Sequence, residues 1–238
     1  MHSIHTTRGF IVGSRPYADA GRVLTIFTRD FGLIYATAQG IRLEKSKLRY
    51  YTQEYSFGAY SLVRGKEFWR LTSANGESQD LRFTIHDLRS EHKELIARIA
   101  LLLRRLLQGE EPHPELFDIV FECWKFLVGH LTVGLIVDMA GGSIKMLGEP
   151  NEDIISMREN LNDGTISMYE KLNDEEMRTL ESLVVARVLS ALGYIGEVAG
   201  ISDRLRSIEI TPELLRALSS QRTILNQHIN KALKESML

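Results

Sequence analysis

The spacing of the apolar residues changes once along the chain, close to Asn75-Gly76. Before this point apolar and polar residues alternate in short runs, which is the pattern of half-buried β-strands. After it, apolar residues recur every three or four positions, which is the period of an amphipathic helix. A single change of this kind predicts an α+β protein in which the strands come first and the helices follow.

The first part of the sequence predicts a small barrel. Two pairs of strand-like runs flank short turns, 29–32 and 64–66, each of which contains glycine. One longer connection, 40–51, separates the third run from the fourth. Five short strands spaced in this way fit a closed five-stranded barrel, of which the OB-fold is the common kind, with an SH3-like barrel as the alternative. The expected strands are 3–12, 21–28, 33–39, 52–63 and 68–74.

The second part predicts an all-helical domain. Asn173 and Glu176 form a capping-box pattern at the start of one helix, and Thr211-Pro212 is a typical start for the last one. We expect helices at 87–108, 114–128, 173–193 and from 212 onward, with a further apolar stretch at 131–147 interrupted by Gly141-Gly142. The predicted division is an OB-fold domain at 1–78 and a helical domain at 79–238.

Charge is distributed unevenly between the two parts. The chain of 238 residues has a net charge of -2, but residues 1–75 carry 11 Lys and Arg against 5 Asp and Glu. The first part is therefore basic and the rest is acidic. A basic domain is the better candidate for binding a polyanion such as nucleic acid.

The basic residues are densest just after the third predicted strand. Four of them, Arg42, Lys45, Lys47 and Arg49, fall within eight residues, and Tyr50-Tyr51 follows directly. Lysine and arginine bind phosphates with release of counterions, and aromatic rings stack on bases. The alternative is an ordinary solvated loop. We expect one of the two tyrosines to be exposed and Phe57 to lie inside the barrel. The predicted DNA-binding residues are Arg8, Arg15, Arg22, Arg42, Lys45, Lys47, Arg49, Tyr50 and Tyr51.

The sequence offers no support for catalysis or for a resident cofactor or metal. It contains neither of the glycine-rich motifs that cradle nucleotide phosphates. The single cysteine, Cys123, lies on the apolar stripe of its predicted helix, where it should behave as a small hydrophobic residue. The longest apolar runs are shorter than a membrane span, and a secretory signal is not recognisable. These features favour a cytoplasmic binding protein rather than an enzyme.

Several stretches of the sequence resemble the RecO family, the bacterial mediators of recombination and DNA repair. The similarity covers about 50 N-terminal residues and is weaker near the C-terminus. The segments that carry it are Thr7–Val12, Asp19–Thr28, Gly32, Ala38–Arg42, Lys45–Arg49, Ala186–Tyr194 and Lys231–Leu238.

The resemblance implies a function as well as a fold. It implies a protein that binds single- and double-stranded DNA, anneals complementary strands, and works with RecR and single-stranded-DNA-binding protein to load the RecA recombinase. Two departures from the family matter. The zinc-binding cysteines of many members are absent from 196–203, so we expect that region to be held by packing alone. Gln39 and Glu44 replace a basic residue and a proline, which should make DNA affinity modest.

The resemblance also implies a site for the acidic, hydrophobic C-terminal tail of single-stranded-DNA-binding protein. Such a tail needs an apolar groove between helices with a cation for its carboxylate. The best candidate is the leucine stripe of helix 87–108 beside helix 114–128, with Arg98, Arg104 and Arg105 as the partner-binding residues. The alternative is that the stripe is ordinary core and the arginines are solvated.

A second class of function fits the same sequence. The barrel could be a non-catalytic protein-interaction module whose contact with DNA is incidental. Phosphate binding weakens steeply as salt is raised, whereas docking through apolar pockets does not. The salt dependence of binding therefore separates the two hypotheses.

Overall fold

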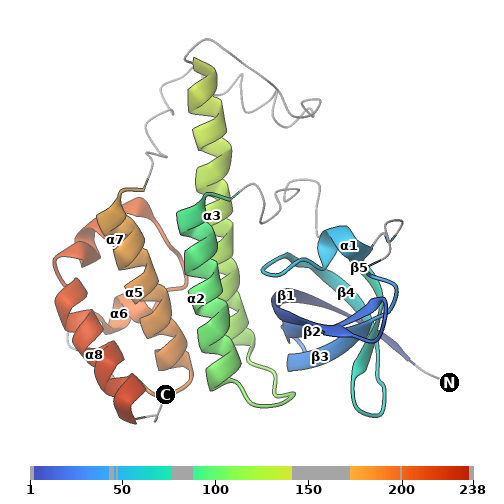
Figure 1. Cartoon of the computed structure of the whole chain (residues 1–238). Coiled ribbons are helices and arrows are strands. Elements are labelled where there is room, and N and C mark those ends of the chain that lie inside the picture. Colours follow the sequence, from blue (N-terminus) through green and yellow to red (C-terminus); the bar gives the residue numbers. More distant parts are fainter. Residues whose placement is uncertain are drawn as a thin grey trace.

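The computed structural model describes residues 3–42, 46, 48–76, 88–140, 172–198 and 200–235. Expectations that concern Lys45, Lys47, Glu44, the Gly141-Gly142 break or the stretch 148–171 fall outside the described residues. Figure 1 shows a β-barrel on one side, the paired helices α2 and α3 in the middle, and α5 to α8 on the other side.

Five strands form the barrel, and they close in the order β1-β2-β3-β5-β4. Neighbouring strands are antiparallel except for β3 and β5, which are parallel. A short helix, α1 (Leu48–Tyr51), lies in the connection between β3 and β4. This strand order is OB-like, so the predicted barrel type is confirmed over the SH3-like alternative. The strands are β1 (Ile4–Tyr17), β2 (Gly21–Thr28), β3 (Gly32–Ala38), β4 (Phe57–Val63) and β5 (Trp69–Asn75).

Strand β1 is longer than predicted because it is shared between two neighbours. Its first half pairs with β4, from Ile4 to Phe10, and its second half pairs with β2 as far as Tyr17. The register shifts between Ile11 and Gly13, and such a bulge bends a strand and increases its twist. The single bent strand thus helps to close the barrel.

Six further helices make up the rest of the described chain. One predicted boundary was wrong because 114–128 and the start of 131–147 are a single helix. The last helix was also predicted wrongly, since it breaks at Ser220-Gln221. The Ser219 hydroxyl donates to the carbonyl oxygen of Arg216, and serines that bond their own backbone in this way weaken helices. The helices are α2 (Ser90–Leu106), α3 (Pro114–Ala140), α5 (Asp174–Ala191), α6 (Ser202–Arg206), α7 (Pro212–Ser219) and α8 (Arg222–Glu235).

Both predicted helix caps are confirmed. The Asn173 side chain accepts a hydrogen bond from the Glu176 backbone, and the Glu176 carboxylate accepts one in return from the Asn173 backbone. Thr211 caps α7 by accepting from the backbone N–H of Leu214. Satisfying these otherwise unpaired N–H groups fixes where each helix starts.

The structure contains two hydrophobic cores, and one of them joins the barrel to the helices. The barrel interior forms one core, centred on residues such as Ile26 and Tyr60. The outer wall of the barrel contributes to the second core, which extends through α2 and α3 to α8. Phe57 is buried as predicted but lies in this second core, against Phe121 and Trp124 at ring distances of 4.9 and 5.3 Å. Its predicted place inside the barrel was wrong because helices cover the wall from which it projects.

The connection between α2 and α3 also holds the barrel in place. Glu110 accepts a hydrogen bond from the indole N–H of Trp69 at 3.0 Å and pairs with Arg64 at 2.9 Å. The backbone of Glu111 packs directly on Gly32, at the start of β3.

In the described part of the chain, no helix is both long and apolar enough to cross a lipid bilayer.

Candidate nucleic-acid interface

A basic hollow of about 680 Å³ lies where the barrel meets α1 and α2. Arg22, Arg42 and Arg49 line it together with Lys93, and Glu54 is the one carboxylate among its described lining residues. Four cations around a hollow with one anion create a positive field that attracts phosphate groups. Three of the predicted DNA-binding arginines are thus brought together by the fold.

Each arginine reaches the hollow from a different element. Arg22 lies on β2 opposite Ala38, at the end of the barrel. Arg42 follows β3, where its backbone N–H and its guanidinium donate to the carbonyl oxygens of Ala20 and Asp19 at 3.2 and 3.3 Å. Arg49 lies on α1 and is exposed. The β1–β2 turn therefore fixes the position of Arg42, whereas α1 carries Arg49.

Lys93 is not among the DNA-binding residues predicted from the sequence. This lysine lies on α2, more than forty residues beyond the basic loop, and it enters the hollow because α2 packs against the barrel. A half-buried lysine on the polar side of an amphipathic helix has no distinctive local pattern. Only the packing of α2 on the barrel reveals its role.

Two other predicted cations lie elsewhere on the barrel. The guanidinium of Arg8 lies 4.4 Å from the ring centre of Phe121 and 5.4 Å from that of Phe57. It belongs to the half of β1 that α3 covers, and it is not among the residues that line the hollow. Arg15 is exposed near the end of β1. Lys45 and Lys47 lie outside the described residues.

The two tyrosines at the end of the basic loop differ in exposure. Tyr50 is 52% exposed, and Tyr51 is half-buried against the barrel core. Their rings meet edge to face at 4.9 Å. The prediction that one of them is exposed is therefore confirmed, and Tyr50 is the one available to a ligand.

Comparisons with known proteins agree with this geometry. Residues 1–78 match the family described as "Recombination protein O N terminal". Through these residues the chain is similar to the N-terminal part of that family. A protein named "DNA repair protein RecO" from Desulfitobacterium hafniense is 30% identical over 118 residues, which is 50% of this chain and 42% of that protein. One with the same name from Halalkalibacterium halodurans is 27% identical over 119 residues, which is 50% of this chain and 45% of that protein. The matched segment thus spans less than half the length of these relatives.

The three arginines predicted to bind a partner occupy different settings. Glu181 of α5 pairs with Arg98 through both carboxylate oxygens, and these hydrogen bonds raise the pKa of Arg98. Arg104 lies over Gly13 of β1, where a β-carbon would be 3.2 Å from its Nη1 atom. Arg105 is exposed. The fold therefore does not gather them into one cluster.

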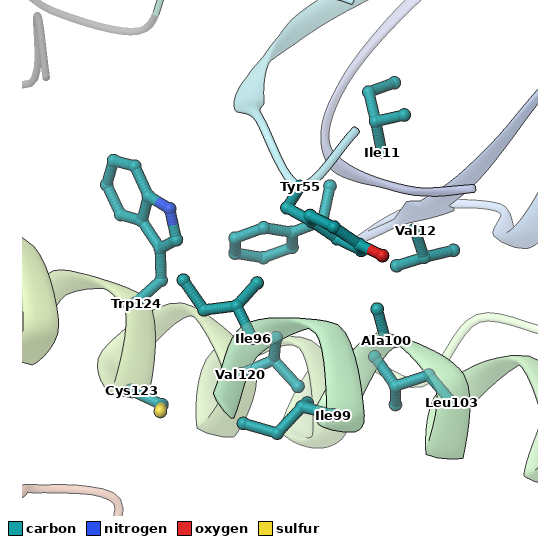
Figure 2. Close-up of a pocket in the computed structure, with 11 residues that line it drawn as sticks. Ile11, Val12, Tyr55, Ile96, Ile99, Ala100, Leu103, Val120, Cys123 and Trp124 are labelled. Atoms are coloured by element: carbon teal, nitrogen blue, oxygen red, sulfur yellow. The ribbon is translucent and has the colours of Figure 1, made fainter. Parts of the chain in front are cut away.

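The apolar stripe between Arg98 and Arg105 on α2 is part of the hydrophobic core. Ile99 and Leu103 of α2 face Val120 and Trp124 of α3 across a pocket of about 20 Å³, and β1 and Tyr55 cover it (Figure 2). A pocket of this size holds about one water molecule. The barrel thus occupies the face where a peptide groove was predicted, as expected from the alternative that the stripe is ordinary core.

The remaining candidate groups are the single cysteine, Cys123, and any cluster of metal-ligating side chains. Cys123 is buried, and burial raises the pKa of its thiol to about 12, so it is protonated at neutral pH. Within the ranges that the structure describes, no group of three or more His, Cys, Asp and Glu side chains is placed to hold a metal ion.

One buried cation, in α5, was not predicted from the sequence. Arg187 of α5 is 1% exposed and donates hydrogen bonds to the carbonyl oxygens of Arg204, Ile208 and Glu209 at 2.9 to 3.1 Å. Burial lowers the pKa of its guanidinium to about 10, so the group stays charged at neutral pH. The guanidinium ties α6 and the segment between α6 and α7 to α5. These acceptors lie just beyond 196–203, the region expected to be held by packing alone, and within that region Glu197 pairs with Arg206 at 2.7 Å.

Proposed function

We propose that this protein is a DNA repair and homologous recombination mediator that binds single- and double-stranded DNA through the basic hollow. The observation that supports this most strongly is the convergence of Arg22, Arg42, Arg49 and Lys93 on one hollow, beside an OB-like barrel that is similar to the N-terminal part of the RecO family. The relatives are named DNA repair proteins, which agrees with a nucleic-acid ligand.

The same hollow accounts for strand annealing without a chemical step. Two complementary strands repel each other through their phosphates, and a cationic surface that holds one backbone lowers the repulsion felt by the second. The mediator role then requires no catalytic residue. Bringing strands together in this way would also prepare them for a recombinase.

Removing Arg42 and Arg49 should weaken DNA binding and annealing together. In the variant Arg42→Ala/Arg49→Ala we expect the slope of log K against log salt for a single strand to fall in magnitude by about 1.4, at about 0.7 per phosphate-contacting cation. Fluorescence anisotropy with a labelled oligonucleotide over a salt series measures this slope. Annealing of two complementary oligonucleotides should slow in the same variant.

The matched control is Lys231→Ala/Lys234→Ala, which removes two exposed cations from α8, away from the hollow. Its slope should equal that of the unmodified protein. Unchanged affinity of the Arg42→Ala/Arg49→Ala variant at low salt would contradict the proposal. A salt-independent affinity of the unmodified protein would favour the protein-interaction module instead.

We also propose that RecR, the tail of single-stranded-DNA-binding protein and, indirectly, RecA are partners. For the tail, α2 offers a second surface apart from its buried stripe. Leu101 is 49% exposed, and exposed Arg105 lies four positions after it on the same side of the helix. Arg98, three positions before Leu101, is already paired with Glu181. An apolar residue beside a cation suits a peptide that is both acidic and hydrophobic.

Binding of the tail peptide should depend on this exposed side of α2. The variant Leu101→Asp/Arg105→Glu should lower the affinity for a fluorescent tail peptide at least tenfold, because it removes an apolar contact and reverses a charge. Lys125→Glu reverses an exposed charge on α3 and serves as the control. Equal peptide affinity in the Leu101→Asp/Arg105→Glu variant and the unmodified protein would place the tail site elsewhere.

A further inference from the structure

Three aromatic side chains project from the outer face of the barrel. Tyr17 and Tyr35 are 46% and 47% exposed, and Phe68 is half-buried. The rings of Tyr17 and Phe68 meet edge to face at 6.1 Å. None of the three lines the hollow.

The strand pattern explains why these rings point outward. In β3 the neighbours of Tyr35, Ile34 and Ala36, are fully buried in the barrel interior, so Tyr35 projects from the opposite face. The parallel pairing of β3 with β5 joins Ala36 to Trp69 and Thr37 to Arg70. Tyr35 and Phe68 occupy the preceding positions of these two neighbouring segments. The register thus places an exposed ring of β3 beside the ring that contacts Tyr17.

These rings differ from the other aromatic residues of the outer wall. Phe10, Phe27 and Phe57 also project outward, but α2 and α3 cover them and they are buried. Tyr17 and Tyr35 keep nearly half of their surface in water. Packing in the described part of the chain therefore does not account for large aromatic side chains at these two positions.

The charges around the rings identify the kind of ligand. Arg15 lies two residues before Tyr17 in β1, and Arg70 lies two residues after Phe68 in β5, so each projects to the same side as its neighbouring ring. Both arginines are exposed. In the turn before β5, exposed Lys66 and Glu67 offset each other. Stacking rings flanked by cations complement unpaired bases and their phosphates, whereas an apolar peptide would gain nothing from the arginines.

We propose that Tyr17, Tyr35 and Phe68 form a stacking platform for the unpaired bases of single-stranded DNA, separate from the phosphate-binding hollow. The inference rests on the proposed DNA-binding function and deepens it. The hollow binds the backbone of either form of DNA, whereas the platform needs bases that are free to unstack. The platform therefore gives the protein a preference for single strands.

The test uses the variant Tyr17→Leu/Phe68→Leu of the 238-residue chain, with Tyr194→Leu as the control for loss of an exposed tyrosine elsewhere. Leucine keeps apolar bulk and removes the aromatic ring. Affinity for a single-stranded oligonucleotide should fall about tenfold or more, from the loss of base stacking. Affinity for duplex DNA should not change. Circular dichroism and the melting temperature report whether the variant is folded.

A second measurement needs no variant. The unmodified protein should bind an oligonucleotide of abasic sites at least tenfold more weakly than one with bases, while Tyr17→Leu/Phe68→Leu should bind both alike. Equal affinity of the unmodified protein for the two oligonucleotides would overturn the platform, as would unchanged single-strand affinity of the variant. Either result leaves the hollow intact as a DNA site. If the hollow does not bind DNA, the affinity for duplex DNA should instead be unchanged in Arg42→Ala/Arg49→Ala.

Discussion

Replacing Gly32 with alanine should lower the free energy of unfolding by about 3 kcal/mol or more. Gly32 has a φ of +67°, which costs other residues about 1–2 kcal/mol. A β-carbon there would also overlap the carbonyl oxygen of Glu111, so the connection between α2 and α3 must move. Overpacking of this kind typically costs about 1–3 kcal/mol. Urea denaturation followed by circular dichroism measures the change.

Gly109→Ala separates the two contributions. Gly109 lies in the same connection and has a φ of +80°, but a β-carbon there would meet nothing within 4 Å. Its variant should therefore lose only the backbone contribution, about 1–2 kcal/mol. Equal losses in the two variants would mean that the contact of Gly32 with Glu111 contributes nothing to stability.

Replacing Arg187 with methionine should strongly destabilise the helical part of the chain. Methionine fills much of the same space but cannot donate to the carbonyl oxygens of Arg204, Ile208 and Glu209. Leaving a buried polar group without its partner costs about 1–3 kcal/mol. We expect a total loss of about 3 kcal/mol, because part of the cost is regained when a buried charge is removed. Thermal and urea unfolding measure it.

Arg178→Met is the control, since Arg178 lies on the same helix and is exposed. Its effect should be within about 0.5 kcal/mol. Arg187→Lys should be intermediate, because an ammonium group retains the charge but cannot match the spread of a guanidinium over three acceptors. A loss below about 1 kcal/mol in Arg187→Met would contradict the role given to this side chain.

The strands could be predicted well where burial of the inner barrel face alone determines the alternation of apolar and polar residues. The alternation in 21–28 marks β2 with its observed ends, because its inward residues must be apolar. The alternation could not show that part of the outer wall is covered as well. Phe57 was therefore placed inside the barrel, although it lies between the barrel and α3. Only contacts between segments far apart in sequence distinguish these two kinds of burial.

The candidate site could be predicted only in its local part. Arg42 and Arg49 were found because they are close together in the sequence. Lys93 and Arg187 were missed since each acquires its role from the packing of a helix. Phe68 and Tyr17 were missed for a similar reason, because the contact of their rings joins opposite ends of the barrel sequence. A cluster of charges in the sequence identifies a basic loop, whereas residues that meet only through tertiary packing cannot be found in this way.

The core shared by the barrel and the helices limits how freely the barrel could be exchanged between proteins. Phe10, Phe27 and Phe57 are buried only because α2 and α3 lie over them. A barrel fused to another protein without those helices would expose three phenylalanines as one apolar patch that promotes association. The unit that can be inherited intact is therefore the barrel with its two covering helices, and a substitution on α3 can constrain which residues the barrel wall accepts.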